Sequence, residues 1–231
     1  MLEDIFKAKI PGYNVHNTLP VARPGLVFMA AGSVVTLILW LFGLDAASLV
    51  FLALTVFTAY FFRDPRRPTP PGGFGLSPAD GKVIRIQPDA ACPVTGRRSI
   101  KVSVFMNLFS VHVNRVPVSG RLLSQEYFRG KFVNAAFDKA SEHNERNALV
   151  IEAGDGSRVT VVQIAGLIAR RIVSWVNPGQ ELTRGERFGM IRFGSRLDLY
   201  LPEDSEIMVA LGQKVSAGWS PVWRNPGKAG G

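Results

Sequence analysis

Residues 189–202 read Gly-Met-Ile-Arg-Phe-Gly-Ser-Arg-Leu-Asp-Leu-Tyr-Leu-Pro, and the rest of the chain is interpreted from this stretch outward. Apolar and polar side chains alternate over residues 197–201, which predicts a β-strand. The pair Gly194-Ser195 stands directly before that strand. By itself, a Gly-Ser pair indicates only a turn with a surface hydroxyl. Its meaning therefore depends on what accompanies it elsewhere in the chain.

Other short runs with β-branched or alternating residues follow a stretch rich in proline and glycine. Turn residues separate these runs, and only residues 130–145 look irregular enough for a loop or a short helix. The pattern predicts an all-β domain with many short strands, arranged as a barrel or a sandwich. Residues 80–83 and 212–215 look like equivalent entries into two of its strands. The further predicted strands are residues 82–86, 100–105, 149–152, 159–164 and 207–211.

The N-terminal quarter has a different pattern. Residues 25–43 and 46–62 are two runs without a charged side chain, separated only by Leu44-Asp45. Each run is close to the length that crosses the hydrocarbon core of a bilayer. Aromatic residues near the ends, such as Trp40 and Tyr60, suit the membrane interface. The sequence predicts a helical membrane hairpin over residues 25–62, spanning or re-entrant; the alternative is a pair of buried core helices.

Basic residues flank both outer ends of this hairpin. The positive-inside rule therefore predicts a cytoplasmic N-terminal segment, residues 1–24, and a cytoplasmic C-terminal domain at the cell membrane. Residues 63–78 form a linker rich in proline and glycine, and residues 79–231 form the β-rich domain. The basic residues after the hairpin either attract anionic lipid or serve only as a topology signal. The flanking residues are Lys7, Lys9, Arg23, Arg63, Arg66 and Arg67.

Composition limits the classes of function. The chain has 231 residues, 47% of them hydrophobic, which argues against disorder. A formal net charge of +9 favours nucleic acid, an acidic substrate or anionic lipid as partner. A nucleic-acid binder is disfavoured because the aromatic residues are not interleaved with the basic ones. The single cysteine, Cys92, excludes an intrachain disulfide and a Cys-rich metal site, so no metal is expected.

Three residues could supply an activated nucleophile. His112 is one of three histidines and lies in a strand-like segment, where alternation puts His112 and Asn114 on one face. Asp80 precedes a glycine in a turn, and Ser195 follows Gly194. Each has an ordinary structural interpretation when taken alone. Together they are a carboxylate, an imidazole and a hydroxyl, the groups with which enzymes activate a serine.

Five ordered motifs carry a resemblance to a known family. The motifs are Phe62-Arg63-Asp64-Pro65, Pro78-Ala79-Asp80-Gly81, the run from His112 to Gly120, Asn144-Glu145-Arg146-Asn147 and Phe193-Gly194-Ser195. They resemble the short form of phosphatidylserine decarboxylase from about the hairpin to near the C-terminus. The resemblance implies a mainly β catalytic domain with an N-terminal membrane hairpin.

The resemblance implies a proenzyme that cuts itself between Gly194 and Ser195. Residues 1–194 would become the β subunit and residues 195–231 the α subunit of a heterodimer, with a higher oligomer left open. Ser195 would become a covalent pyruvoyl group that forms a Schiff base with the amine of phosphatidylserine. Loss of CO2 would then give phosphatidylethanolamine, without metal or nucleic acid. The anionic membrane would be the second partner.

The same resemblance implies roles for individual residues. His112 would act as base for the Ser195 hydroxyl and as proton donor in turnover, and Asp80 would orient it. Arg115 is a candidate for a contact with the substrate head group, and the segment that holds Asn144 and Arg146 is either a substrate-binding loop or only a turn. Arg115 occupies the position of a second histidine found in longer members, and Phe-Gly-Ser-Arg replaces their Leu-Gly-Ser-Thr motif. The alternative function is a non-catalytic membrane-anchored adaptor of the barrel-sandwich type, which would keep the Gly194–Ser195 bond intact.

Overall fold

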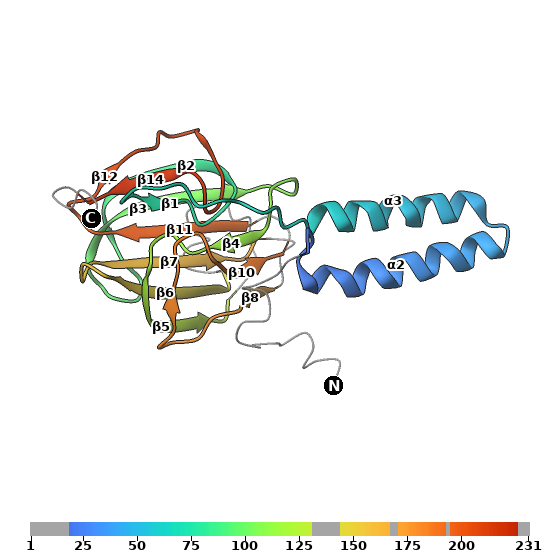
Figure 1. The fold of residues 1–231 in the computed structure, drawn as a ribbon, viewed down its shortest axis with the longest axis horizontal. Helices are drawn as coiled ribbons and strands as arrows, with labels where there is room; N and C mark the ends of the chain where they lie inside the picture. Colours follow the sequence, from blue (N-terminus) through green and yellow to red (C-terminus); the bar gives the residue numbers. More distant parts are fainter. Residues whose placement is uncertain (1–18, 131–143, 167–170, 193–194, 226–231) are drawn as a thin grey trace. The chain divides into compact units, whose positions relative to one another are not determined.

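The computed structural model describes residues 19–130, 144–166, 171–192 and 195–225 (Figure 1). The chain divides into two compact units, and the helical one extends from residue 16 to residue 66. The other unit contains all the described residues from Arg67 onward and is the β domain. Each unit is described by itself.

The helical unit is an antiparallel hairpin of α2 (Arg23–Leu41) and α3 (Asp45–Phe61). The turn between them uses Gly43 at a φ of 71°, a left-handed conformation that glycine adopts without strain. The helices pack closely, because a Cβ on Gly32 would lie only 2.3 Å from the Thr55 hydroxyl. At the open end, the backbone N–H of Ala22 donates to the carbonyl of Phe62 over 2.7 Å.

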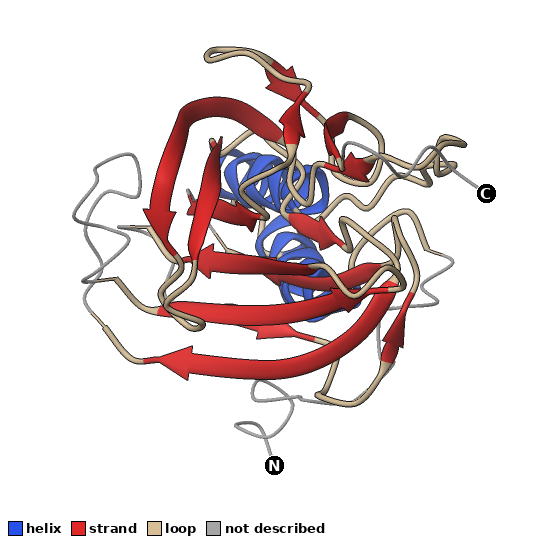
Figure 2. Cartoon of the chain, turned by 90° about the vertical axis from the view of Figure 1, so that its left-hand side faces the viewer, coloured by secondary structure: helices blue, strands red, loops and turns tan. Residues whose placement is uncertain are grey.

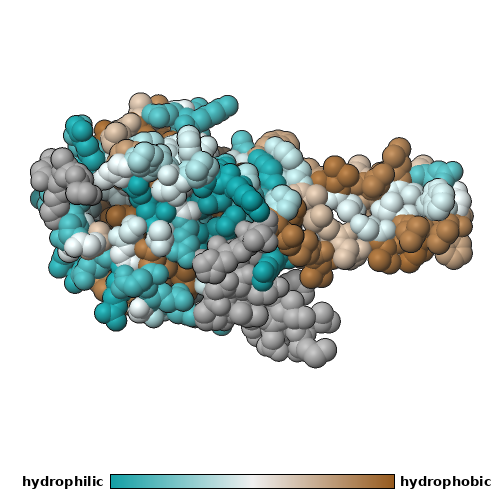
Figure 3. Space-filling model, in the orientation of Figure 1, coloured by the Kyte–Doolittle hydropathy of each residue, from teal (hydrophilic) through white to brown (hydrophobic). Residues whose placement is uncertain are grey.

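Most apolar side chains of this hairpin are exposed (Figure 3). Leu41 and Leu49, for example, are 69% and 67% exposed. Core helices of a soluble protein would show the opposite. Helix α2 has 19 residues and is long and apolar enough to cross a membrane, whereas α3 is shorter at 17 residues. These exposures fit the predicted membrane hairpin and disagree with a pair of buried core helices.

The β domain contains many short strands, as the sequence predicted. Its strands are β1 (Gly75–Leu76), β2 (Gly81–Ala91), β3 (Arg98–Met106), β4 (Val113–Arg115), β5 (Gly120–Phe128), β6 (Arg146–Ala153), β7 (Arg158–Ile164), β8 (Ile172–Ser174), β9 (Glu181–Leu182), β10 (Arg187–Ile191), β11 (Ser195–Leu201), β12 (Glu206–Ile207), β13 (Lys214–Val215) and β14 (Pro221–Arg224).

The largest sheet has eight strands in the order β13-β2-β3-β11-β7-β6-β5-β9, and every neighbouring pair is antiparallel. It curls into a half-barrel (Figure 2), which confirms the predicted mainly β, barrel-like class. Two sheets of three strands, β4-β10-β8 and β1-β14-β12, complete the described part of the domain. Strand β11 therefore lies in the interior of the large sheet, between β3 and β7.

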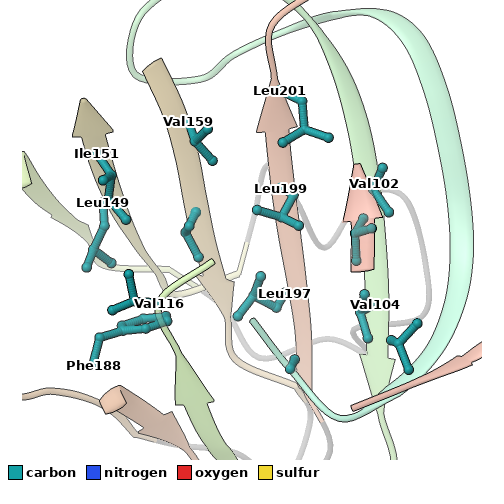
Figure 4. Packing of buried hydrophobic residues seen from close by; sticks show 14 of the residues in the cluster. Val102, Val104, Val116, Leu149, Ile151, Val159, Phe188, Leu197, Leu199 and Leu201 are labelled. Atoms are coloured by element: carbon teal, nitrogen blue, oxygen red, sulfur yellow. The ribbon is translucent and has the colours of Figure 1, made fainter. Parts of the chain in front are cut away.

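The inner face of the large sheet carries the main hydrophobic core (Figure 4). Leu197, Leu199 and Leu201 of β11 are fully buried, and every residue of this strand is buried. Burying a leucine side chain is worth about 1.5–3 kcal/mol, so this strand alone makes a large contribution to stability. Its neighbours in the core include Val102 and Val104 of β3, Leu149 and Ile151 of β6, and Val159 of β7.

The opposite face of β11 carries charged and polar side chains. Arg196 Nε lies 2.8 Å from Asp198 Oδ1, and Lys101 Nζ lies 3.3 Å from Asp198 Oδ2. Burial, followed by the charge of Asp198, raises the pKa of Tyr200 above its usual range. A buried ion cluster adds little net stability, but it penalises any shift that would separate its charges. Both faces of β11 are thus fixed.

Five of the predicted strands lie within β2, β3, β6, β7 and β11. The prediction for residues 207–211 is wrong, because β12 ends at Ile207 and the chain then turns: Gln213 N–H donates to the Ala210 carbonyl over 3.1 Å. The two similar segments at residues 80–83 and 212–215 meet each other, since β13 pairs with β2 through Lys214 and Lys82. Residues 131–143 of the predicted irregular segment lie outside the described residues.

Candidate active site

Ser195 is the first residue of β11 and is fully buried. It pairs with Met106, the last residue of β3, and its hydroxyl Oγ lies 3.9 Å from the Met106 sulfur. The interpretation of Ser195 as a surface hydroxyl, which an isolated Gly-Ser pair would suggest, is therefore wrong. Gly194 lies outside the described residues. A thioether is a weak acceptor, so Ser195 is held without a strong hydrogen bond to this neighbour.

The three-stranded sheet β4-β10-β8 brings Asn114 to the same methionine. His112 and Asn114 are both fully buried; His112 directly precedes β4, and Asn114 lies in the middle of that strand. The amide nitrogen of Asn114 donates to the same Met106 sulfur over 3.6 Å. The partner of Asn114 on β10 is Gly189, where a Cβ would lie 2.4 Å from the Val173 carbonyl oxygen. Glycine thus lets β10 approach β8 closely behind Asn114.

Asp80 is held by Arg67 and by the backbone. Its carboxylate accepts two hydrogen bonds from the Arg67 guanidinium, the one to Oδ2 over 2.7 Å, and another from the Ala217 N–H over 2.7 Å. Arg67 also donates to the Ala217 carbonyl over 2.9 Å. Arg67 is therefore committed to the β domain rather than exposed for lipid. The pair fixes the entry to β2 against the segment that follows β13.

We expect Asp80→Asn to lower the free energy of unfolding by about 1–3 kcal/mol, because it removes the negative charge and replaces one accepting oxygen with an NH2 group that would face the Arg67 guanidinium. Urea titration in a Ser195→Ala background, where the chain should stay in one piece, would measure this. Arg67→Met serves as the second corner of a double-mutant cycle. Additive effects of the two substitutions would contradict a direct coupling between these side chains.

The three predicted substrate-contacting residues have structural contacts of their own. Arg115 is buried and donates to the Gly185 carbonyl over 3.0 Å. Asn144 is fully buried and donates to the Ala165 carbonyl over 2.7 Å. The guanidinium of Arg146 lies 4.4 Å from the centre of the Phe128 ring. Their roles in substrate binding stay predictions.

Several further polar residues escaped the sequence analysis. Arg171 directly precedes β8 and Arg192 directly follows β10, and the Arg192 N–H donates to the Arg171 carbonyl over 3.2 Å. Burial, followed by the nearby Arg171 charge, lowers the pKa of Arg192. Two like charges this close together make a positive region that would attract an anion. Asn147 and Gln163 are fully buried amides inside strands, where the alternating pattern gave no sign of a polar interior.

A cavity of about 620 Å³ lies elsewhere in the β domain. Val159 lines this cavity and lies at the end of β7 that is next to Leu201 of β11. Ser195 lies at the opposite end of β11. A strand of this length spans roughly 20 Å, so the cavity and Ser195 are well separated. Within the described ranges, no three His, Cys, Asp or Glu side chains gather as a metal site would require. The polar lining of the cavity includes Ser119, Asp155, Ser157, Arg184 and Asn225.

Comparison with known proteins gives first the class: the chain is an enzyme of the decarboxylase type. The family described as phosphatidylserine decarboxylase matches residues 54–222, which include β2 to β11 and every predicted site residue. The chain belongs to the phosphatidylserine decarboxylase family. The resemblance inferred from the five motifs is thereby confirmed.

Individual relatives resemble the chain over most of its length. A phosphatidylserine decarboxylase proenzyme of Syntrophus aciditrophicus (strain SB) is 50% identical over 205 residues, covering 87% of this chain and 96% of the relative. The proenzyme of Paraburkholderia xenovorans (strain LB400) is 50% identical over 198 residues, covering 85% and 93%. The proenzyme of Nitratidesulfovibrio vulgaris (strain Hildenborough) is 50% identical over 208 residues, covering 90% and 95%.

Proposed function

We propose that this enzyme decarboxylates phosphatidylserine to phosphatidylethanolamine and CO2 after cutting itself between Gly194 and Ser195. The observation that supports it best is the complete burial of Ser195 at the head of an interior strand, next to Met106. A serine without a chemical role would be expected at the surface rather than buried in an interior strand. The relatives are named proenzymes, which suits a chain that is processed before it acts.

Self-cleavage needs only groups of the chain. Ser195 Oγ attacks the Gly194 carbonyl as its proton passes to His112; the Gly194–Ser195 C–N bond then breaks, His112 returns the proton to the departing nitrogen, and an ester with a free Ser195 amino group remains. Loss of the Ser195 Cα proton forms a Cα–Cβ double bond while the Cβ–Oγ bond breaks, and Gly194 leaves as a carboxylate. Water then replaces nitrogen at Cα and releases ammonia. The products are the proposed β subunit, residues 1–194, and the α subunit, residues 195–231.

A pyruvoyl group fits the surroundings of Ser195. The group is small and uncharged, and the site is buried, with the Met106 thioether on one side and the Asn114 amide as a hydrogen-bond donor. When bound, it supplies a carbonyl that joins the substrate amine and withdraws the electrons left by CO2. Met106 and Asn114 would hold it.

The remaining steps fall to side chains around the group. We assign His112 as the donor of the proton that the substrate carbon takes up after decarboxylation, since imidazole titrates near neutral pH. Asp80 would orient His112, and its bonds with Arg67 and Ala217 fix the entry to β2. Arg171 and Arg192 would attract the phosphate or carboxylate of the substrate head group. Arg115, Asn144 and Arg146 remain the proposed contacts on the substrate side.

We propose that the hairpin, residues 25–62, anchors the enzyme in the cell membrane. Residues 1–24 and the β-rich domain, residues 79–231, would then face the cytoplasm, with residues 63–78 as linker. The support is the exposed apolar surface of α2 and α3 and the basic residues that flank them. This arrangement would bring the site to anionic phospholipid without release of the lipid into water.

Denaturing mass spectrometry of the purified protein tests the proposed function. We expect two fragments that meet at Gly194 and Ser195, the smaller one without a free N-terminal amine. The same preparation should release CO2 from phosphatidylserine in mixed micelles. An intact chain without activity would instead support the membrane-anchored adaptor.

A further inference from the structure

A chain of buried amides runs across the inner side of the domain toward Ser195. Gln125 Nε2 donates to Asn147 Oδ1 over 3.1 Å, and Asn147 Nδ2 donates to Gln163 Oε1 over 2.9 Å. Gln163 Nε2 then donates to Asn114 Oδ1 over 2.8 Å. Asn114, Asn147 and Gln163 are fully buried. Four strands, β5, β6, β7 and β4, each supply one amide to this chain.

The Met106 sulfur, at the end of this chain of amides, determines which group of each amide donates and which accepts. The Met106 sulfur can only accept hydrogen bonds, so Asn114 must turn its NH2 group toward it. The Asn114 oxygen is then left for Gln163, and the same order follows for Asn147 and Gln125. A buried amide that loses its partner is costly, so each member holds the next in orientation. A donor rather than an acceptor is therefore presented beside Ser195.

Met106 is where the amide chain and Ser195 meet. Its sulfur lies 3.6 Å from Asn114 Nδ2 and 3.9 Å from Ser195 Oγ. Both groups thus border one weakly accepting atom, and either would form a stronger bond with an oxygen that carries negative charge. Ser195 Oγ becomes such an oxygen when it departs with Gly194 as a carboxylate. Asn114 is the described amide donor that borders the same sulfur.

We propose that Asn114 donates a hydrogen bond to the oxygen derived from Ser195 Oγ as that oxygen leaves in the elimination step. In this step the Cα–H pair of electrons forms the Cα–Cβ double bond, and the Cβ–Oγ pair goes to the Gly194 carboxylate. The proton from Cα goes to the base, which is His112 in the proposed function on which this role rests. Gln163, Asn147 and Gln125 act as positioning residues, because they act only through Asn114.

The proposed role predicts which step slows. A donor to Oγ makes the neutral hydroxyl no better a nucleophile, but it stabilises the negative charge on the departing oxygen. Loss of one such preorganised donor typically slows a step by about 10²–10³-fold. Removal of the Asn114 amide should therefore spare formation of the ester and delay its elimination. The ester between Gly194 and Ser195 should accumulate.

Hydroxylamine treatment of the full-length protein distinguishes the steps. Hydroxylamine cleaves an ester and frees a fragment that begins with an unmodified Ser195, whereas matured enzyme gives a pyruvoyl-blocked fragment of different mass. We expect Asn114→Ala and Asn114→Asp to give the Ser195 fragment as the main product, with the blocked fragment formed at least about 100-fold more slowly. Variants that mature like the parent, or that stay folded, intact and resistant to hydroxylamine, would overturn the proposed role.

A second variant tests the same role if the Asn114 variants do not fold. Gln163→Glu keeps the shape of its side chain but puts an acceptor where Gln163 donated, so Asn114 should turn its oxygen toward Met106. Hydroxylamine-labile ester should accumulate there too, and normal maturation of a folded Gln163→Glu protein would count against the role. The matched control is Thr160→Ala, a buried residue of the same strand on the opposite face, which should mature normally. An uncut parent would refute self-cleavage itself.

Discussion

A Ser195→Ala variant should remain one intact chain and release no CO2 from phosphatidylserine. The hydroxyl is both the proposed attacking group and the source of the atoms that become the carbonyl group, so no other residue can replace it. Loss of activity should be complete within detection rather than partial. Mass spectrometry of the purified variant gives the state of the chain, and trapping of released CO2 gives its activity.

Folding must be measured alongside, because Ser195 is fully buried. Its described hydroxyl contact is a long one to the Met106 sulfur, so we expect the unfolding free energy to change by less than about 1 kcal/mol. Ser205→Ala is the matched control: this serine is also buried, and its hydroxyl contacts Asn225 away from β11. Decarboxylation retained by Ser195→Ala would exclude the pyruvoyl mechanism.

His112→Ala should slow self-cleavage by about 10²–10⁴-fold, the usual contribution of a positioned general base. His112 is fully buried and directly precedes β4, the strand that carries Asn114. A time course of fragment formation after synthesis in a cell-free system would give the rate directly. His112→Gln, which fills more of the space left by the imidazole, separates lost chemistry from lost packing.

His16→Ala is the control for this variant, since it removes a histidine from the N-terminal segment instead. Equal slowing by His112→Ala and His112→Gln, with His16→Ala unaffected, would support a role as base. Normal processing with lost turnover would assign His112 to the mature reaction alone. Processing and turnover both at the parental rate would remove His112 from the site.

Local patterns predicted the strands with dense apolar runs but missed several others. Val102, Leu149 and Leu199 sit in runs dense with apolar or β-branched residues, and such runs become interior strands. Strand β5 was missed because it carries polar side chains on a partly exposed surface, which obscures its alternation. Residues 207–211 look equally apolar, yet a turn ends the strand. Pairing partners, which sequence alone does not reveal, decide these cases.

The site shows the same division. Ser195, His112 and Asp80 could be singled out because their motifs stand in a recognisable order. From the sequence, Arg67 was interpreted as a basic residue flanking the membrane hairpin. Its ion pair with Asp80, which the sequence did not reveal, gives it a structural role in the β domain. Gln163 and Asn147 gave no signal, since their partners lie on strands distant in sequence. Hydrogen bonds between distant amides depend on the register of the sheet, which local alternation does not determine.

The position of β11 between two partner strands has a consequence for the lifetime of the protein. Seven residues from Ser195 pair with β3, and five of the same strand pair with β7. If the chain is cut before Ser195, the shorter piece would stay in place although no covalent bond holds it. Unfolding would then separate two molecules, and refolding would become bimolecular and sensitive to dilution. The matured enzyme would persist for as long as its unfolding barrier allows, assembled once and not readily rebuilt.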